Sequence, residues 1–545
     1  MGLGLGLRLW GIGFGLPNLH CRPDESTVVN KALAVGAGQL NPGFFNYPSF
    51  HFYLLAAVYG VLYLLGRLCG LLAGVADAER LFVIEPQAFY LVARVLTALL
   101  GSAAVVLVYL MGRHLGGRRA GLLSATFLSV AFLHVRDSHF ATVDVPATTY
   151  ALAGCLLALH HVGRPSGGAV HLSAVCFGLA VSTKYSLAPT IACLLAAIWL
   201  TDRRRALYGF VLAGAVMAAT FLVTTPFAAL EFRSFWRDLA FERAHFASGH
   251  AGLAPLGGVG WLHHLRFSLW HGLGFALLAC GIAGAAWMAW RRQPASLCVL
   301  GAALAYFAVA GGGRTVFVRY ALPLVPFLCV AAGLLVSRLP RGALLVTVAL
   351  AAPTALASAS FDRVMARTDT RVLAAQWLEE TVPDGAVIAM CGSDYGYPQV
   401  RLTREWLRQE LEDVQAAGLE GSRLKAALGL EGYPPPPSYR VLQVRPEGAL
   451  RRRSLRATAD LDSLRREGVE WVVVHEHPLV YSRVDTALAR ELAVEAALVK
   501  GLDPFARGAE LAVYDPQDAF YVPLAGFGSI GRPGPAIRIY RLRVP

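Results

Sequence analysis

Long apolar runs, separated by short polar loops, occupy the chain up to residue 360. A hydrocarbon core of about 30 Å needs roughly 17–25 apolar residues per helix, so these runs predict a polytopic α-helical membrane domain of about 11–12 transmembrane segments. We expect one of the runs, 50–72, to lie at the outer surface or to enter and return rather than to cross. The candidate segments are 2–17, 50–72, 88–111, 119–134, 142–162, 169–182, 185–201, 206–225, 269–290, 295–312, 318–337 and 342–360.

Beyond residue 360 the apolar positions follow shorter, mixed periods that indicate alternating helices and strands. This pattern predicts a soluble α/β domain over 361–545, following a membrane domain over 1–360. Helices are expected at 370–381, 403–416 and 461–467, and strands at 470–475 and 536–542, and a short apolar run covers 386–390.

The arginines of the membrane domain indicate its orientation. From residue 88 onward, clusters such as Arg203–Arg205 and Arg291–Arg292 fall on alternate loops, and the positive-inside bias makes that side cytoplasmic. Nearly all the acidic residues of the domain then lie on the outer side. The same parity places the C-terminal domain outside, so we expect a multi-pass protein of a cell membrane, as in a bacterial inner membrane.

Composition agrees with this class of protein. The chain is 56% hydrophobic and 16% charged, whereas soluble proteins carry about a quarter charged residues. Its net charge of +13 arises in the membrane domain, where basic residues report orientation, so it gives no argument for nucleic-acid binding. Seven of the nine cysteines lie in apolar stretches, and no disulfide framework is encoded.

Two carboxylates, Asp24 and Glu25, follow the first apolar segment directly. They could act as a general base and a ligand for a hydroxyl group or a metal. The alternative is that Asp24 caps a helix whose first turn contains Glu25. Spacing alone favours the helix cap.

A second polar loop runs from Arg136 to Pro146 on the same predicted face. Asp144 lies at the edge of an apolar segment, where a carboxylate is costly and often functional. Asp144 could instead cap a helix with Pro146 in its first turn. A helix cap at Asp144 would not explain why Arg136 and His139 lie in the same loop.

Two isolated cations lie further along the predicted outer face. Lys184 is one of only four lysines in the chain, and Arg319 lies at the head of an apolar segment against the positive-inside bias. Both suit phosphate oxygens, although Lys184 could instead extend to the membrane interface. The outer histidines show no metal-ligand spacing, so no metal is assigned. Acids and cations on one outer face suggest group transfer from a phosphate-bearing lipid.

With these motifs the chain resembles the GT-C glycosyltransferases, close to the protein O-mannosyltransferase and aminoarabinose-transferase superfamily. The resemblance covers nearly the whole chain. It rests on Pro23-Asp24-Glu25, on the segment Asn46–Tyr53, on Asp144-Val145-Pro146, on Ser182–Tyr185, on Arg319–Pro323 and on Arg532-Pro533-Gly534-Pro535.

The resemblance implies a polyprenyl-phosphate-sugar donor, inversion at the sugar, an outward active site and outer juxtamembrane helices after the first Pro motif. It implies that Asp24 is the catalytic base and that Glu25 contacts a sugar, and we place Asp144 with them as the third catalytic residue. The basic residue that often precedes Pro in related enzymes is replaced by Asn46-Tyr47, which leaves Lys31, Lys184 or Arg319 for the donor phosphate. The remaining predicted residues are Lys184, Arg319 and Arg136 for the donor phosphate, and His51, Tyr53, His139 and Tyr320 for the substrate.

The acceptor is a hydroxyl group on a glycan, a lipid or a protein, and membrane lipids are further expected partners. The sequence leaves open the sugar and the use of a divalent metal. The alternative function is a polytopic lipid or solute transporter with an outer ligand-binding domain, which would also hold ionisable residues at membrane depth. A sensor with an outer ligand-binding domain is a third class, but it does not explain those residues.

Overall fold

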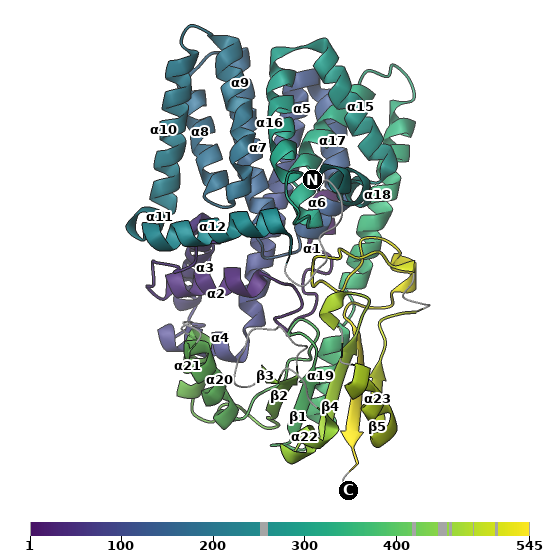
Figure 1. The fold of residues 1–545 in the computed structure, drawn as a ribbon. Coiled ribbons are helices and arrows are strands. Elements are labelled where there is room, and N and C mark those ends of the chain that lie inside the picture. Colours follow the sequence, from purple (N-terminus) through teal and green to yellow (C-terminus); the bar gives the residue numbers. More distant parts are fainter. Residues whose placement is uncertain are drawn as a thin grey trace. The chain divides into compact units, whose positions relative to one another are not determined.

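The computed structural model describes residues 2–250, 260–416, 421–444, 455–456, 460–482, 484, 486–506 and 511–543, which form two compact units (Figure 1). The first unit comprises Met1–Ile12, Thr27–Tyr59 and Val92–Asp362, and the second comprises Gly13–Ser26, Gly60–Leu91 and Arg363–Pro545. Two segments from the membrane half of the sequence therefore belong with the C-terminal domain.

The first unit is helical. Its apolar segments form α-helices because a helix satisfies every backbone hydrogen bond within itself, which the hydrocarbon core demands. The elements that lie wholly or largely in it are α1 (Gly2–Leu9), α2 (Glu25–Gly36), α3 (Phe50–Leu68), α5 (Gln87–Val130), α6 (Phe132–Asp137), α7 (Asp144–Gly163), α8 (Gly167–Val181), η1 (Tyr185–Ile191), α9 (Ala192–Thr201), α10 (Ala206–Thr224), α11 (Phe227–Leu230), α12 (Phe232–Ser248), α13 (Gly260–His263), η2 (His264–Ser268), α14 (Leu269–Leu273), α15 (Phe275–Arg291), α16 (Pro294–Ala310), η3 (Val318–Ala321), α17 (Leu324–Val336) and α18 (Ala343–Met365).

Several of these helices are long and apolar enough to cross a membrane. Among the described residues there are five, or six if a pair bent by 116° counts as one span, and four shorter apolar helices accompany them. The bend falls between α14 and α15 at Gly274, and α5 is interrupted at Gly117, where φ is 83°. This interruption separates the predicted segments 88–111 and 119–134.

The prediction of a spanning helix over 2–17 is wrong for the described residues. Helix α1 covers only Gly2–Leu9, and Gly11 and Gly15 beyond it have positive φ values of 82° and 69°. Eight residues rise about 12 Å, less than half of a hydrocarbon core of about 30 Å. Glycine adopts left-handed conformations readily, so the glycine-rich sequence turns instead of continuing the helix.

Within segment 50–72, residues Phe50–Leu68 form one unbroken helix, α3, of 19 residues. A re-entrant hairpin inside the helix is therefore ruled out. Its length and hydropathy would suffice for a crossing, and its location at the outer surface stays a prediction.

Small residues allow close helix packing in the first unit. A side chain at Gly284 of α15 would collide with the backbone of Ala331 in α17. Close approach of backbones through small residues is typical of helix pairs in membranes, where dispersion contacts replace the hydrophobic effect. In Figure 1 the amphipathic helix α12 lies crosswise to α8 and α10.

The second unit contains a six-stranded sheet in the order β3-β2-β1-β4-β6-β5. The strands β1, β2, β3 and β4 are parallel, and β6 pairs antiparallel with β4 and β5. The elements are α4 (Val75–Ile84), α19 (Thr370–Thr381), β1 (Val387–Cys391), α20 (Arg404–Ala416), α21 (Ser422–Gly429), β2 (Arg440–Val444), β3 (Leu455–Arg456), α22 (Leu461–Arg466), β4 (Trp471–Glu476), η4 (Val480–Ser482), α23 (Thr486–Glu495), β5 (Ala496–Leu502), η6 (Phe527–Ser529) and β6 (Ala536–Leu542).

Alternate residues of β1 face the two sides of the sheet, as the two-residue strand period requires. Ala389 packs with Leu461 and Leu488, from α22 and α23, on one side, whereas Ile388 packs with Leu378 of α19 on the other. The prediction of a C-terminal α/β domain is confirmed. The three helices and two strands predicted in this domain all occur, with ends that differ by one residue at most, and the apolar run 386–390 becomes strand β1. Strands β2, β3 and β5 and helices α21 and α23 were not predicted.

Candidate active site

Asp144 and Lys184 form an ion pair in the first unit. Asp144 is the first residue of α7, and Lys184 immediately precedes η1 after α8 has ended. The Lys184 ammonium also lies 4.9 Å from the centre of the Tyr320 ring. The first unit therefore brings together one predicted catalytic carboxylate, one predicted phosphate-binding cation and one predicted substrate-binding ring.

The segment that carries Tyr320 and Arg319 is held from α16. The Tyr306 hydroxyl donates a hydrogen bond of 2.8 Å to the backbone oxygen of Tyr320. Arg319 is only 9% exposed, and its guanidinium lies 4.5 Å from the centre of the Phe317 ring. Tyr306 was not predicted, because nothing in an apolar helix distinguishes a functional tyrosine from a packing one.

The beginning of α3 is bonded to the turn that precedes Lys184. The Phe50 amide donates to the Ser182 carbonyl at 3.0 Å, and the Ser49 amide donates to the Thr225 hydroxyl at 3.3 Å. His51, the next residue of α3, is 1% exposed, and its Nδ1 has no hydrogen-bond partner among the described residues. This geometry places His51 in the same part of the unit as Lys184. Tyr53 lies two residues further on and donates to the Leu40 carbonyl at 2.9 Å.

Acidic residues of α12, and Glu231 immediately before it, bind the loop that leads into α3. Asn41 donates to Glu231 at 2.6 Å, the Phe45 amide donates to Asp238 at 3.1 Å, and Asn46 donates to Glu242 at 2.6 Å. The side chain of Lys31, one of the alternative phosphate ligands, donates to the Pro42 carbonyl at 2.6 Å. The asparagines therefore anchor the loop to Glu231 and Glu242, and Lys31 of α2 anchors it at Pro42. The role of the α12 acids was not predicted from the sequence.

Arg136 and His139 are buried in the first unit. Arg136 pairs with its neighbour Asp137 at 3.1 Å. The ring nitrogens of His139 lie 2.9 Å from the Val135 carbonyl and 3.0 Å from the Trp10 carbonyl, and Nε2 is 3.4 Å from Asp362. Because both ring nitrogens are engaged, the contacts favour a structural role for His139. Binding of donor phosphate by Arg136 and of substrate by His139 stays a prediction.

Asp24 and Glu25 lie in the second unit, and Glu25 opens α2. Asp24 has a φ of 73°, in the left-handed region. An ordinary N-cap residue has an extended backbone, so this conformation departs from the simple helix cap. Non-glycine residues in strained conformations cluster at functional sites. Glu25 is fully buried.

The surroundings of Asp24 in the second unit are acidic. Burial, followed by the negative charges of Asp24, Asp394 and Asp518, raises the pKa of Tyr395 to about 12. Asp24 therefore lies within electrostatic reach of the Tyr395 ring. Among the described residues, no group of three or more His, Cys, Asp or Glu side chains could hold a metal ion.

The predicted residues thus fall into two sets. Asp144, Lys184, Arg319, Tyr320, His51, Tyr53, Arg136 and His139 belong to the first unit, and Asp24 and Glu25 belong to the second. The convergence of the two sets in one pocket stays a prediction.

Comparison with known proteins gives a family for part of the chain and a fold for all of it. Residues 89–229 match the model of the dolichyl-phosphate-mannose-protein mannosyltransferase family. This region includes Arg136, Asp144 and Lys184. No curated protein sequence gives a significant match.

Two solved structures are similar over most of the chain. The crystal structure of ArnT from Cupriavidus metallidurans bound to undecaprenyl phosphate is 14% identical, with 99% of this chain and 96% of that chain covered and a TM-score of 0.51. The apo crystal structure of the Archaeoglobus fulgidus oligosaccharyltransferase is 13% identical, with 87% and 69% covered and a TM-score of 0.47. At these identities the similarity to ArnT shows the fold.

Proposed function

We propose that this chain, a multi-pass membrane glycosyltransferase of the GT-C type, transfers a sugar from a polyprenyl-phosphate donor to a hydroxyl acceptor. The transfer takes place at the outer face of the membrane and inverts the configuration of the sugar. Asp24 is the base, Glu25 contacts a sugar, and Lys184 and Arg319 bind the donor phosphate.

The Asp144–Lys184 pair is the observation that carries the proposal. It lies beside Tyr320 and within the region that matches the mannosyltransferase family. A lysine ammonium has three donors, and among the described residues Lys184 donates to one acceptor, Asp144. Its other donors can bind phosphate oxygens while Asp144 fixes its position. The similarity to a structure that holds undecaprenyl phosphate supports a polyprenyl-phosphate donor.

The proposed reaction is a direct displacement. Asp24 accepts the proton of the acceptor hydroxyl, the acceptor oxygen forms a bond to the anomeric carbon, and the bond from that carbon to the phosphate oxygen breaks. The electron pair leaves with polyprenyl phosphate, and the nearby cations stabilise the charge that develops there. Attack opposite to the leaving phosphate inverts the anomeric carbon.

The test is transfer of radiolabelled sugar from a polyprenyl-phosphate donor by the purified full-length protein in lipid nanodiscs. We expect Asp24→Asn to lower kcat by about 10³-fold, since general base catalysis contributes about 10²–10⁴-fold. Asp144→Asn should mainly raise KM for the donor, because it releases Lys184. Asp202→Asn is the matched control, since Asp202 is exposed in a loop between α9 and α10 that we predict to be cytoplasmic.

Full activity of Asp24→Asn would remove Asp24 as the base. Retention of configuration in the product, measured by NMR, would contradict direct displacement. Counterflow of an unchanged solute in vesicles without a glycosylated product would support the transporter alternative instead. Cysteine labelling from outside the cell at positions 24 and 144 tests whether both lie on the outer face.

A further inference from the structure

The loop over residues 13–26, which carries the predicted base, belongs to the same unit as the C-terminal domain. Asp24 within this loop holds a φ of 73°. The left-handed conformation is costly for a residue with a side chain and persists only where surrounding contacts determine it. Three groups of contacts from the C-terminal domain hold this loop.

The first contact is a buried ion pair two residues before Asp24. One terminal nitrogen of Arg22 donates to both carboxylate oxygens of Asp518, at 2.7 Å and 2.6 Å. The two side chains are 0% and 3% exposed. The Arg22 guanidinium also lies 5.1 Å from the centre of the Phe520 ring, which packs edge-on against Phe14. The segment between β5 and β6 therefore holds both ends of the loop.

The second group comes from the segment that follows β1. The Asn18 side chain donates to the Tyr397 carbonyl at 2.9 Å, and the Leu19 amide donates to the Gln399 side chain at 2.8 Å. This segment begins at the carboxyl end of β1. In the sheet β1 lies between β2 and β4, so the chain continues to one side of β1 and later returns to the other. Such a switch point is where open α/β sheets usually bind ligands. Here Asn18 and Leu19 of the loop are hydrogen-bonded to the segment that follows β1, next to this switch point.

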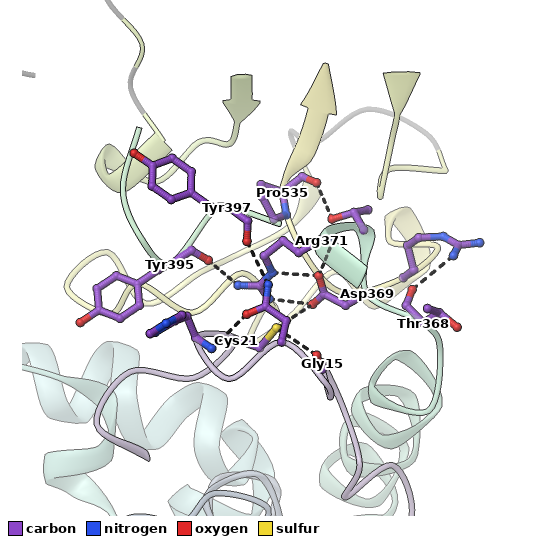
Figure 2. Close-up of polar contacts among 12 residues, drawn as sticks. Gly15, Cys21, Thr368, Asp369, Arg371, Tyr395, Tyr397 and Pro535 are labelled. Atoms are coloured by element: carbon purple, nitrogen blue, oxygen red, sulfur yellow. Dashed lines mark hydrogen bonds and ion pairs between the residues drawn. The ribbon is translucent and has the colours of Figure 1, made fainter. Parts of the chain in front are cut away.

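The third group centres on a fork between Asp369 and Arg371 at the beginning of α19 (Figure 2). Arg371 donates to the two carboxylate oxygens of Asp369 at 2.8 Å and 2.6 Å, and to the Tyr395 carbonyl. The buried thiol of Cys21 lies 3.8 Å from the Asp369 carboxylate and 3.5 Å from the Gly15 carbonyl. The Asp369–Arg371 pair thus links Cys21 of the loop to the backbone of Tyr395.

We propose that Arg22, Asp518, Asp369 and Arg371 are positioning residues for the proposed reaction: they fix the loop so that Asp24 reaches the acceptor proton. This inference rests on the proposed function of Asp24. It makes the C-terminal domain a structural part of the catalytic apparatus. A misplacement of about 1 Å can cost about 10²-fold in rate, so loosening the loop should reduce turnover strongly.

The test is the double variant Arg22→Met/Asp518→Leu in the full-length protein. Replacing a buried ion pair by apolar residues of similar volume usually preserves folding. We expect kcat to fall by about 10- to 100-fold with KM for the donor unchanged. The melting temperature should stay close to that of the wild type, which a merely stabilising role for the pair would not predict.

Thiol labelling supplies a readout independent of activity. Cys21 is 0% exposed, so it should resist a maleimide reagent in the wild type and react in the double variant, as followed by peptide mass spectrometry. Arg22→Lys keeps the charge but loses the planar fork, and we expect a loss of only about 3- to 10-fold. Should the double variant not fold, Arg22→Lys carries the test. Glu495→Gln breaks a partly exposed ion pair with Arg465 in the same domain and serves as the control.

The outcomes separate the two proposals. Unchanged kcat in the double variant, together with an inactive Asp24→Asn variant, would overturn the positioning role and leave the proposed function standing. An active Asp24→Asn variant would remove the base instead. In that case labelling alone decides whether the pair holds the loop, and a protected Cys21 in the double variant would refute the inference.

Discussion

The two units bury charge in different ways. In the first unit, the Lys184 ammonium contacts one carboxylate oxygen of Asp144, and the two side chains are 13% and 6% exposed. In the second, Arg371 spans both oxygens of Asp369, and these side chains are 1% and 0% exposed. The planar fork of Arg371 makes two parallel hydrogen bonds to Asp369, whereas among the described residues the Lys184 ammonium donates to one acceptor, Asp144. The two pairs therefore differ in geometry and in exposure, and the proposed function gives this difference a meaning: Arg371 holds structure, and Lys184 binds the donor phosphate.

Gly534→Ala should give the largest change of stability. Gly534 has a φ of 103°, and a side chain there would collide with Thr370 and lie 2.6 Å from the Asp369 carboxylate. We expect the free energy of unfolding to fall by about 3 kcal/mol, because the residue is strained and crowded at once. Thermal unfolding measures this. Gly528→Ala is the control, because a side chain added there would meet no atom within 4 Å beyond its chain neighbours. An equal loss of stability in both variants would show that crowding against Thr370 and Asp369 is not the cause.

Lys184→Met should change activity more than stability. Loss of a charge-assisted hydrogen bond to phosphate is worth about 1.5–3 kcal/mol, so KM for the donor should rise by about 10- to 100-fold. Lys184→Arg should keep part of the affinity for the donor, because a guanidinium is also positively charged but is planar and larger than an ammonium. Steady-state kinetics and melting temperature are measured together. A large drop in melting temperature with unchanged KM would make Lys184 structural, like Arg371, and abolish the contrast.

The C-terminal domain should lose stability in acid. Burial, together with the positive charge of Arg371, lowers the pKa of His475 and of His477 to about 3. In the unfolded chain both protonate near pH 6.5, so stability is complete above that pH and falls as the pH drops towards 3. The loss amounts to about 2 kcal/mol per histidine at pH 5.

His477→Phe tests this prediction. It should remove one histidine's share of the loss while it keeps the ring contacts with Tyr514 and Tyr521. Melting temperatures at pH 7.5 and pH 5 report the difference. An unchanged pH dependence in this variant would mean that His477 titrates normally in the folded protein.

Glu495→Gln should have the smallest effect. The pair with Arg465 spans 2.9 Å, but its side chains are 26% and 46% exposed. Solvent and salt screen charges this exposed, so we expect a melting temperature close to that of the wild type. A change as large as that of Gly534→Ala would show that exposure does not distinguish the ion pairs of this domain.

The sequence predicted much of the secondary structure of the C-terminal domain but not its contacts with the loop of Asp24. Helix 370–381 and strand 470–475 appear as α19 and β4, because amphipathic and buried periods act over a few residues. The edge strand β5 was missed, since its burial alternates poorly and its pairing with β6 is shifted at Leu498. Arg22 lies only two residues before Asp24, but the sequence gives no sign of its partner Asp518, 496 residues away.

The motif Arg532–Pro535 shows the same limit. Its order in the chain supported the resemblance, whereas its physical role lies in contacts with Thr370. The Thr370 amide donates to the Pro533 carbonyl at 3.0 Å, and its hydroxyl donates to the Pro535 carbonyl at 2.7 Å. Gly534 is required because only glycine fits that approach.

Sequence alone determined that this chain is a helical membrane protein with a C-terminal α/β domain, and it selected Asp144, Lys184 and Tyr320 as candidate site residues. Hydropathy and periodicity are local properties, so a single chain displays them. Tertiary structure decided which charges meet. It paired Lys184 with Asp144, and it bound the loop of Asp24 to Asp369 and Asp518. An ion pair depends on distances of a few ångströms between segments hundreds of residues apart, and only the folded chain sets those distances.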